Sequence, residues 1–331
     1  MSMTRTLSAK AESWPIRGSF RIARGAKPEA HVVVAEIADN HVRGRGECVP
    51  YPRYGENVES VRDTIEALAP DIARGLTREE LQARLPAGAA RNALDCALID
   101  WEARTRGARA HALLGLPEPK PVRTAFTLSL DSPEAMALAA TDAAGKGYGL
   151  LKLKIAGGED LARVEAVRKA AAGARLIADA NEGWTFEELV RLTPELAKLG
   201  VALIEQPLKA GEDEALDGFS SPIPLCADES CHTREDLPRI FGRYSHINVK
   251  LDKAGGLTEA LALAREARVR GLKLMVGCMV STSLSMAPAT LLAGMAEFVD
   301  LDGPLLLARD REPGLTYRQD VIEPPSPDFW G

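Results

Sequence analysis

The chain has 331 residues, of which 46% are hydrophobic, and its formal net charge is -6. This length allows one large domain or two of ordinary size, with enough apolar residues for a substantial core. The negative charge and the dispersed basic residues argue against nucleic-acid binding, and no run approaches the ~20 apolar residues of a membrane-spanning helix.

The cysteines and the beginning of the chain predict a cytoplasmic protein. Cysteine occurs at positions 48, 96, 226, 231 and 278. No pair has CxxC spacing and the number is odd, so we expect neither a disulfide framework nor a zinc site. Residues 1–18 contain no apolar segment of the kind found in signal peptides.

Residues from about 4 to 50 are predicted to form strands, of which the β-branched segment 30–37 is the clearest. Two polar loops accompany these strands. The loop at 21–28 contains Arg24, and the loop at 48–56 contains Tyr51. Both loops could simply connect strands, but their Arg and Tyr content also suits a role in covering a ligand.

Residues from about 57 to 106 have helical character, and the segment 89–101 repeats apolar residues at helical spacing. Asp95 and Asp100 lie in this segment, and we expect them on a solvent-exposed helix face. The three prolines at 117–121 indicate a linker, so a domain boundary is expected there.

From Val122 onward, strands alternate with helices, which predicts a parallel sheet. Taking residues 122–128 as the first strand gives eight strands in all. Eight parallel strands with intervening helices predict a closed α/β barrel of the TIM type, with its active site at the carboxyl ends of the strands. The proline-containing tail after about Leu307 is expected to fold back on the first domain.

Strand 151–155 carries Lys152 and Lys154 two residues apart, so both side chains lie on one face of the strand. The other face is apolar, as expected of a strand that packs under helices. Lysine is almost never fully buried unless it is paired. The strand therefore predicts that anionic groups converge on these two ammonium groups.

The next strands provide such groups, because successive apolar runs end at Asp179, Glu205 and Asp228, and a fourth ends at Lys250. From Lys152 through these positions the steps are 27, 26, 23 and 22 residues, about one strand-plus-helix unit each. Three carboxylates without His or Cys form an oxygen-only site that suits Mg²⁺ rather than Zn²⁺. The alternative is that each acid simply pairs with a neighbouring lysine.

Lys154 and Lys250 are expected to approach a bound substrate from opposite sides of the metal-bearing strands. Removal of a proton next to a carboxylate leaves an enediolate, whose charge Mg²⁺ and Lys152 can stabilise. A lysine must be neutral to act as a base, and we expect neighbouring cations to lower its pKa. Two bases on opposite faces permit inversion of the carbon, whereas one base and one acid would support elimination.

This pattern resembles the enolase superfamily in its muconate-lactonising subgroup, which has a KxK strand, an Asp-Glu-Asp metal triad and a lysine on the sixth strand. The resemblance covers nearly the whole chain. Segments 46–56, 85–92, 226–233 and 250–260 are similar to the proteobacterial L-Ala-D/L-Glu epimerases. The resemblance implies one Mg²⁺ per subunit and epimerisation of the Glu residue of a murein-derived dipeptide by 1,1-proton transfer.

The resemblance also implies an α+β capping domain, a modified (β/α)₇β barrel and a set of substrate contacts. The domain ranges we expect are 1–118 for the cap, 119–306 for the barrel and 307–331 for the returning tail. Asp300 and Asp302 match the DxD pair that holds the dipeptide's ammonium, and Arg24 matches the position that meets the Glu side-chain carboxylate. Tyr51 and Cys278 are further candidate substrate contacts. The chain departs from some dipeptide epimerases at Ser281, where they have Glu.

Three alternatives stay open from the sequence. Asp300 and Asp302 could be a structural pair bonded to loop amides or to a basic side chain. An N-acylamino-acid racemase, for example of N-acyl-glutamate, would keep the lysines and the metal triad. A non-catalytic barrel that binds a ligand would be expected to lack a base or a metal ligand, and none is missing. The expected partner is a small molecule, with a homo-oligomer possible and no nucleic acid or membrane.

Overall fold

The structure is a computed structural model that describes residues 4–331 apart from the side chain of Ser19. Its largest element is an eight-stranded parallel sheet with the strands in chain order. The Ala125 amide donates to the Val299 carbonyl at 2.7 Å and joins the first strand to the last, so the predicted closed barrel is confirmed. The strands are β5 (Phe126–Leu128), β6 (Leu150–Lys154), β7 (Arg175–Asp179), β8 (Val201–Glu205), β9 (Leu225–Ala227), β10 (His246–Val249), β11 (Lys273–Gly277) and β12 (Phe298–Asp300).

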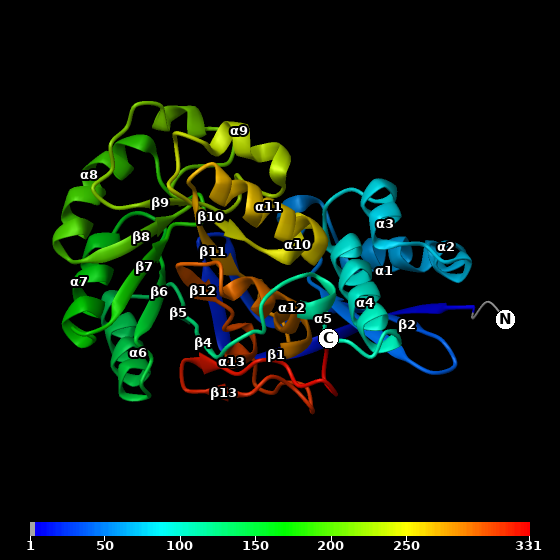
Figure 1. The fold of residues 1–331 in the computed structure, drawn as a ribbon. Coiled ribbons are helices and arrows are strands. Elements are labelled where there is room, and N and C mark those ends of the chain that lie inside the picture. Colours follow the sequence, from blue (N-terminus) through cyan, green and yellow to red (C-terminus); the bar gives the residue numbers. More distant parts are fainter. Residues whose placement is uncertain (1–3) are drawn as a thin grey trace.

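Helices cover the outside of the barrel (Figure 1). After β8 the connection has only a 3-10 helix, η2 (Asp213–Leu216). The other covering helices are α6 (Pro133–Gly145), α7 (Asp160–Ala170), α8 (Phe186–Lys198), α9 (Leu237–Ile240), α10 (Leu251–Ala254), α11 (Leu257–Val269) and α12 (Ser283–Ala293), and α13 (Gly303–Leu306) follows β12. Leu151, Leu153 and Ile155 of the β6 region pack into this outer core, as expected. A smaller inner cluster fills the barrel beneath the strand ends: Ile177, Leu203, Cys226, Met275 and Phe298.

The cap is an antiparallel three-stranded sheet covered by helices, and it lies beside the barrel (Figure 1). The long hairpin of β1 and β2 reaches from the cap to the barrel mouth, where Arg21 N lies 3.4 Å from Ser129 Oγ. The cap elements are β1 (Thr6–Ile22), β2 (Gly25–Ala38), β3 (Arg43–Cys48), η1 (Pro52–Tyr54), α1 (Val58–Ala67), α2 (Ala69–Arg74), α3 (Arg78–Arg84), α4 (Ala89–Thr105) and α5 (Ala110–Leu113).

The expectation that Asp95 and Asp100 face solvent is wrong, because both are fully buried. Helix α4 packs against β3 so closely that a Cβ atom on Gly46 would lie 2.1 Å from a backbone carbonyl of the helix. Asp95 accepts a hydrogen bond from the Thr258 amide at 2.9 Å, and Asp100 accepts one from the Gly331 amide at 2.8 Å. These carboxylates therefore link the cap to the barrel and to the tail.

The segment expected to form the first barrel strand is divided. β4 (Val122–Arg123) pairs with β14 (Val321–Ile322), which pairs with β13 (Tyr317–Arg318), and only Phe126–Leu128 enters the barrel. The end of the tail contacts the cap, where Trp330 Nε1 donates to the Arg45 carbonyl at 2.9 Å. Within residues 4–331, no helix is long and apolar enough to cross a membrane.

Asp252 in α10 joins the cap to the barrel beside the barrel mouth. Its Oδ1 accepts hydrogen bonds from the Val49 amide at 3.0 Å and from Asn92 Nδ2 at 2.8 Å. Burial raises the pKa of Asp252 to about 7, with further contributions from Glu56 and Glu47, while the two hydrogen bonds oppose the rise. An unfolded chain has an Asp pKa of about 3.9.

We therefore predict that Asp252 makes the protein lose stability as the pH rises from about 4 to about 7, because the folded state holds a proton that the unfolded state has released. Asp252→Asn keeps an acceptor at Oδ1 and cannot titrate. Relative to wild type, its free energy of unfolding should improve by about 1–3 kcal/mol between pH 5 and pH 8 in urea titrations. The exposed control Asp63→Asn should show no such change, and an equal Asp252→Asn effect at both pH values would contradict the prediction.

Candidate active site

The charged side chains that the sequence singles out converge at the carboxyl ends of the barrel strands. The parallel register places Lys154 beside Asp179, and Asp179 beside Glu205, as direct neighbours on β6, β7 and β8. Asp228 follows β9 directly, and Lys250 follows β10. All of these side chains are buried.

Lys152 lies at the centre of this cluster and is 1% exposed. Its Nζ is 3.0 Å from Asp179 Oδ2, 2.7 Å from Glu205 Oε2 and 2.8 Å from Asp300 Oδ2. The contact with Asp300 is a hydrogen bond, whereas the Glu205 oxygen is close but outside hydrogen-bonding direction. One ammonium group therefore forms ion pairs with carboxylates from three different strands.

The two proposed bases lie on opposite sides of this centre. Lys154 Nζ donates to Asp179 Oδ2 at 2.6 Å, and Lys250 Nζ donates to Asp228 Oδ2 at 2.6 Å. Strands β7, β8 and β9 separate β6 from β10 in the sheet, so the ammonium groups approach from opposite flanks. This arrangement is what inversion at a carbon between them requires.

The expectation that neighbouring cations lower the lysine pKa values does not hold for Lys250 in this arrangement. Burial lowers the pKa of Lys250, but the charge of Asp228 raises it, and the net pKa lies well above its usual value. The same balance, with Asp300 as the principal carboxylate, raises the pKa of Lys152. The carboxylates act here as counter-ions of the lysines, and a cation bound by those oxygens would compete with these ion pairs.

The fit of these residues to a metal ion can be judged from their oxygen atoms. In the part of the chain that the structure describes, no three His, Cys, Asp or Glu side chains stand as a ready-formed metal site, since lysines lie among the acids. However, Glu205 Oε2 and Asp228 Oδ1 are buried and accept no hydrogen bond from the described residues, although each lies 2.7 Å from a lysine Nζ. An all-oxygen donor set with buried oxygens that lack hydrogen bonds fits a hard cation such as Mg²⁺.

Two residues that the sequence reasoning missed hold Asp228 in place. Lys253 Nζ lies 2.7 Å from Asp228 Oδ1 and also donates to the carbonyls of Cys231 and Asn248. Gln206 Oε1 accepts a hydrogen bond from the Asp228 amide at 2.8 Å. Lys253 is only three residues from Lys250, and this spacing could have indicated a second lysine directed at the site. No feature of the sequence indicates the role of Gln206.

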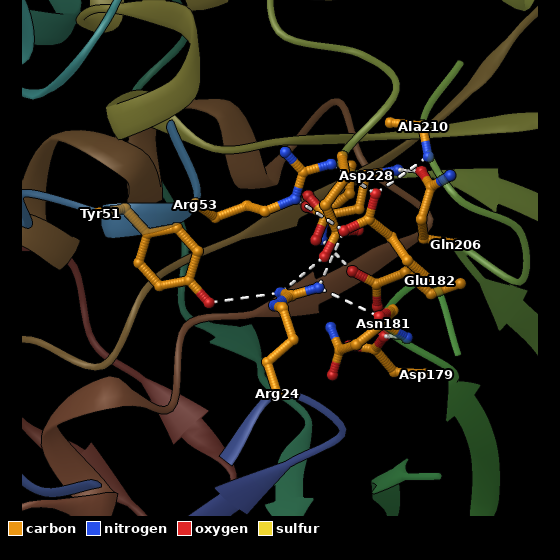
Figure 2. Close-up of polar contacts among 12 residues, drawn as sticks. Arg24, Tyr51, Arg53, Asp179, Asn181, Glu182, Gln206, Ala210 and Asp228 are labelled. Carbon is orange, nitrogen blue, oxygen red and sulfur yellow. Dashed lines mark hydrogen bonds and ion pairs between the residues drawn. The ribbon is translucent and has the colours of Figure 1, made fainter. Parts of the chain in front are cut away.

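Arg24 reaches from the β1–β2 hairpin into the barrel mouth (Figure 2). Its Nη1 donates to the Asn181 carbonyl at 3.0 Å and to Glu182 Oε2 at 3.1 Å. Its Nη2 donates to Glu229 Oε1 at 2.8 Å and to the Tyr51 hydroxyl at 3.3 Å. The structure thus brings Arg24 and Tyr51 together, and it adds two acids that the sequence did not single out.

Asp300 and Asp302 also face the site, with different partners. Asp300 Oδ2 bonds Lys152, while its Oδ1 is buried and accepts no hydrogen bond from the described side chains or amides. Asp302 Oδ2 accepts from the Thr127 amide at 2.6 Å, and burial together with Asp300 raises the pKa of Asp302 to about 7. These are the contacts expected of a structural pair. Cys278 follows β11 and is half-buried, and burial raises the pKa of its thiol.

Family models match both parts of the chain. The model of the mandelate racemase/muconate lactonizing enzyme N-terminal domain matches residues 4–115, and the enolase C-terminal domain-like model matches residues 134–326. The L-Ala-D/L-Glu epimerase of Escherichia coli (strain K12) is 50% identical over 313 residues, 95% of this chain and 98% of that protein. The N-acetyl-D-glutamate racemase of Pseudoalteromonas sp is 46% identical over 302 residues, 91% of this chain and 95% of that protein.

Solved structures agree with this fold. An enolase family member from Agrobacterium tumefaciens with homology to dipeptide epimerases, bound to sodium and L-Ala-L-Glu, is 50% identical with a TM-score of 0.96, covering 99% of this chain and 100% of that one. A dipeptide epimerase from Enterococcus faecalis V583, complexed with Mg and L-Leu-L-Tyr, is 28% identical with a TM-score of 0.91, covering 98% of each chain.

Proposed function

The chain belongs to the mandelate racemase/muconate lactonizing enzyme family of the enolase superfamily, and we propose that it is a dipeptide epimerase acting on L-Ala-D/L-Glu. The observation that carries the proposal is the placement of Lys154 and Lys250 on opposite flanks of one carboxylate cluster. A binding-only barrel would be expected to lack a base or a metal ligand. Inversion at one carbon is an isomerase reaction. A dipeptide of L-Ala and Glu would place the enzyme in murein peptide metabolism.

Asp179, Glu205 and Asp228 are the side chains that would hold one Mg²⁺ per subunit. Their support is the all-oxygen donor set and the buried oxygens of Glu205 and Asp228, to which no described residue donates a hydrogen bond. When bound, Mg²⁺ supplies positive charge beside the substrate carboxylate, where negative charge develops during proton removal. Lys152 contributes a further buried positive charge at the same place.

Lys154 and Lys250 exchange the proton at the α-carbon of the C-terminal residue. One neutral lysine removes the proton from its face, and the other, as an ammonium, returns a proton to the opposite face. The intermediate is an enediolate, and the product is the other epimer. Neither lysine alone can invert the carbon, because each reaches only one face.

We further propose that residues 1–118 form the cap, residues 119–306 the barrel and residues 307–331 the tail, and that cap and barrel share the recognition of substrate. Arg24 binds the side-chain carboxylate of the substrate's Glu residue, and Tyr51 lies beside Arg24. Asp300 and Asp302 bind the ammonium group of the dipeptide, and Cys278 lies next to them after β11.

A second candidate is an N-acylglutamate racemase. The 46% identity to the N-acetyl-D-glutamate racemase favours it, and so does the ion pair that Lys152 already makes with Asp300. An N-acyl substrate has no ammonium for the Asp300–Asp302 pair. The buried Asp300 Oδ1, which accepts no hydrogen bond from the described residues, favours the dipeptide.

We predict that removal of divalent metal with EDTA abolishes activity and that Mg²⁺ restores it. Independently of activity, saturating Mg²⁺ should raise the thermal unfolding midpoint by roughly 5 °C, because it binds only the folded chain. Asp179→Asn should lose this shift, whereas the exposed Asp142→Asn should keep it. Full activity in the metal-free protein would contradict the assignment of the three ligands.

Replacing either base should stop epimerisation, so we predict a loss of at least about 10³-fold in kcat for Lys154→Ala and for Lys250→Ala. Each variant should still exchange the α-proton of one epimer with D₂O, because exchange needs only one face. We expect Lys154 to serve the L-Glu epimer and Lys250 the D-Glu epimer. NMR of both epimers checks this pattern, and normal epimerisation by Lys250→Ala would rule out the two-base mechanism.

The two candidate substrates differ in charge, so their turnover separates them. We predict that L-Ala-L-Glu is turned over and that N-acetyl-L-Ala-L-Glu and N-acetyl-L-Glu are poorer by at least about tenfold in kcat/KM. A neutral acylated nitrogen offers the buried Asp300 Oδ1 no charge-assisted hydrogen bond, at a cost of about 1–3 kcal/mol. If N-acetyl-L-Glu is the best of the three, the racemase assignment replaces the dipeptide assignment.

A further inference from the structure

Glu182 lies where loops of the cap and the barrel meet, and the proposed chemistry does not use it. Its Oε2 accepts hydrogen bonds from Arg53 Nε at 2.9 Å and from Arg24 Nη1 at 3.1 Å. Its Oε1 accepts from Arg53 Nη2 at 2.8 Å and from the Ala210 amide at 2.9 Å. Figure 2 shows both arginines directed at this one carboxylate from separate segments.

The backbone that carries Glu182 is strained. Asn181 and Glu182 both have positive φ angles, of 45° and 68°, directly after the metal-ligand strand β7. A left-handed conformation is unfavourable for a residue with a Cβ atom, and Glu adopts it less readily than Asn. Such strain persists where surrounding contacts hold it, and the Glu182 amide is held by the Gln206 carbonyl at 2.9 Å. The strained turn aims the carboxylate at the cap.

Burial and charge make these contacts firm. The side chain of Glu182 is 8% exposed, against 27% for Arg24 and 40% for Arg53. Burial raises the pKa of Glu182, but the hydrogen bonds from Arg53 and the Ala210 amide lower it by more, so the net pKa is below its usual value and the carboxylate is charged. A bidentate hydrogen-bonded ion pair between an arginine and a buried carboxylate is strong and directional.

The other acid on Arg24 is held differently. Glu229 bonds Arg24 through Oε1, and its buried Oε2 accepts no hydrogen bond from the described residues. Both oxygens of Glu182, in contrast, accept two hydrogen bonds each. Glu229 makes the shorter contact with Arg24, 2.8 Å against 3.1 Å, so the two acids hold the Arg24 guanidinium together, and Glu182 in addition holds Arg53.

We propose that Glu182 is a positioning residue for substrate specificity: it fixes Arg24 and fastens two cap segments, 20–26 and 50–56, across the barrel mouth. The inference deepens the proposed function and rests on it for the role of Arg24. A guanidinium already held in one orientation loses less conformational freedom when it binds a carboxylate. Glu182 thereby increases discrimination in favour of acidic side chains without touching the substrate.

The fastening can be tested without substrate by hydrogen–deuterium exchange of the full chain. Glu182→Gln keeps the shape of the side chain but removes its charge, and exchange in segments 20–26 and 50–56 should become about tenfold faster in both. Arg53→Gln should loosen 50–56 much more than 20–26. The matched control is Glu195→Gln, which removes an exposed surface ion pair with Lys198 and should change neither segment. A wild-type exchange rate in either segment of Glu182→Gln overturns the proposal.

Kinetics test the specificity role. Glu182→Gln should raise KM for L-Ala-L-Glu about tenfold, leave kcat within about twofold, and leave KM for L-Ala-L-Gln unchanged. Equal changes in KM for both dipeptides would overturn the role. Glu182→Gly is the second variant, because its φ of 68° suits glycine and folding should not suffer. It should show the same two effects. If wild type turns over neither dipeptide, the proposed function fails, and hydrogen exchange alone still decides the fastening.

Discussion

The ammonium of Lys152 is the interaction on which the site depends. It lies within 3.0 Å of carboxylates from β7, β8 and β12, in a position with almost no access to water. Burying several like charges together is costly unless opposite charges lie between them. The parallel register makes this possible, because it brings the carboxyl ends of neighbouring strands to one level with the inner apolar layer below them.

The cap extends this charge pattern. Arg24 and Arg53 come from cap loops, and both meet the acid that follows β7. Deeper in the junction, Asp95 and Asp252 accept amide hydrogen bonds across the boundary between cap and barrel. The cap is therefore held to the barrel by buried polar contacts as well as by apolar packing, and such contacts fix geometry more strictly than apolar packing alone. A residue on the β1–β2 hairpin can thus act as part of a site built on the barrel.

Much of this could be predicted from the sequence, because short apolar strands that end in a charged residue recur at steps of one strand-plus-helix unit. The rest depends on contacts between distant segments. Val122–Arg123 leaves the barrel because its partner strand, Val321–Ile322, lies in the tail. Asp100 is buried because β3 approaches α4 through glycines, and Asp95 is buried because the start of α11, at Gly256 and Thr258, packs against α4. The helix pattern reveals neither contact. The position of Glu182 could not be predicted, because the sequence does not indicate that a non-glycine residue has a positive φ angle.

If Lys154 and Lys250 transfer the α-proton on opposite faces of the substrate, the hydrogen isotope at the α-carbon of the product will reveal it. L-Ala-L-Glu is converted by the wild-type protein with Mg²⁺ in D₂O, and the L-Ala-D-Glu formed at low conversion is analysed by NMR. A two-base mechanism predicts deuterium at the α-carbon of the product, because the second lysine delivers a deuteron that it has exchanged with solvent. A product that retains the original α-hydrogen would mean that a single base carries it from one face to the other, and would rule out the two-base mechanism.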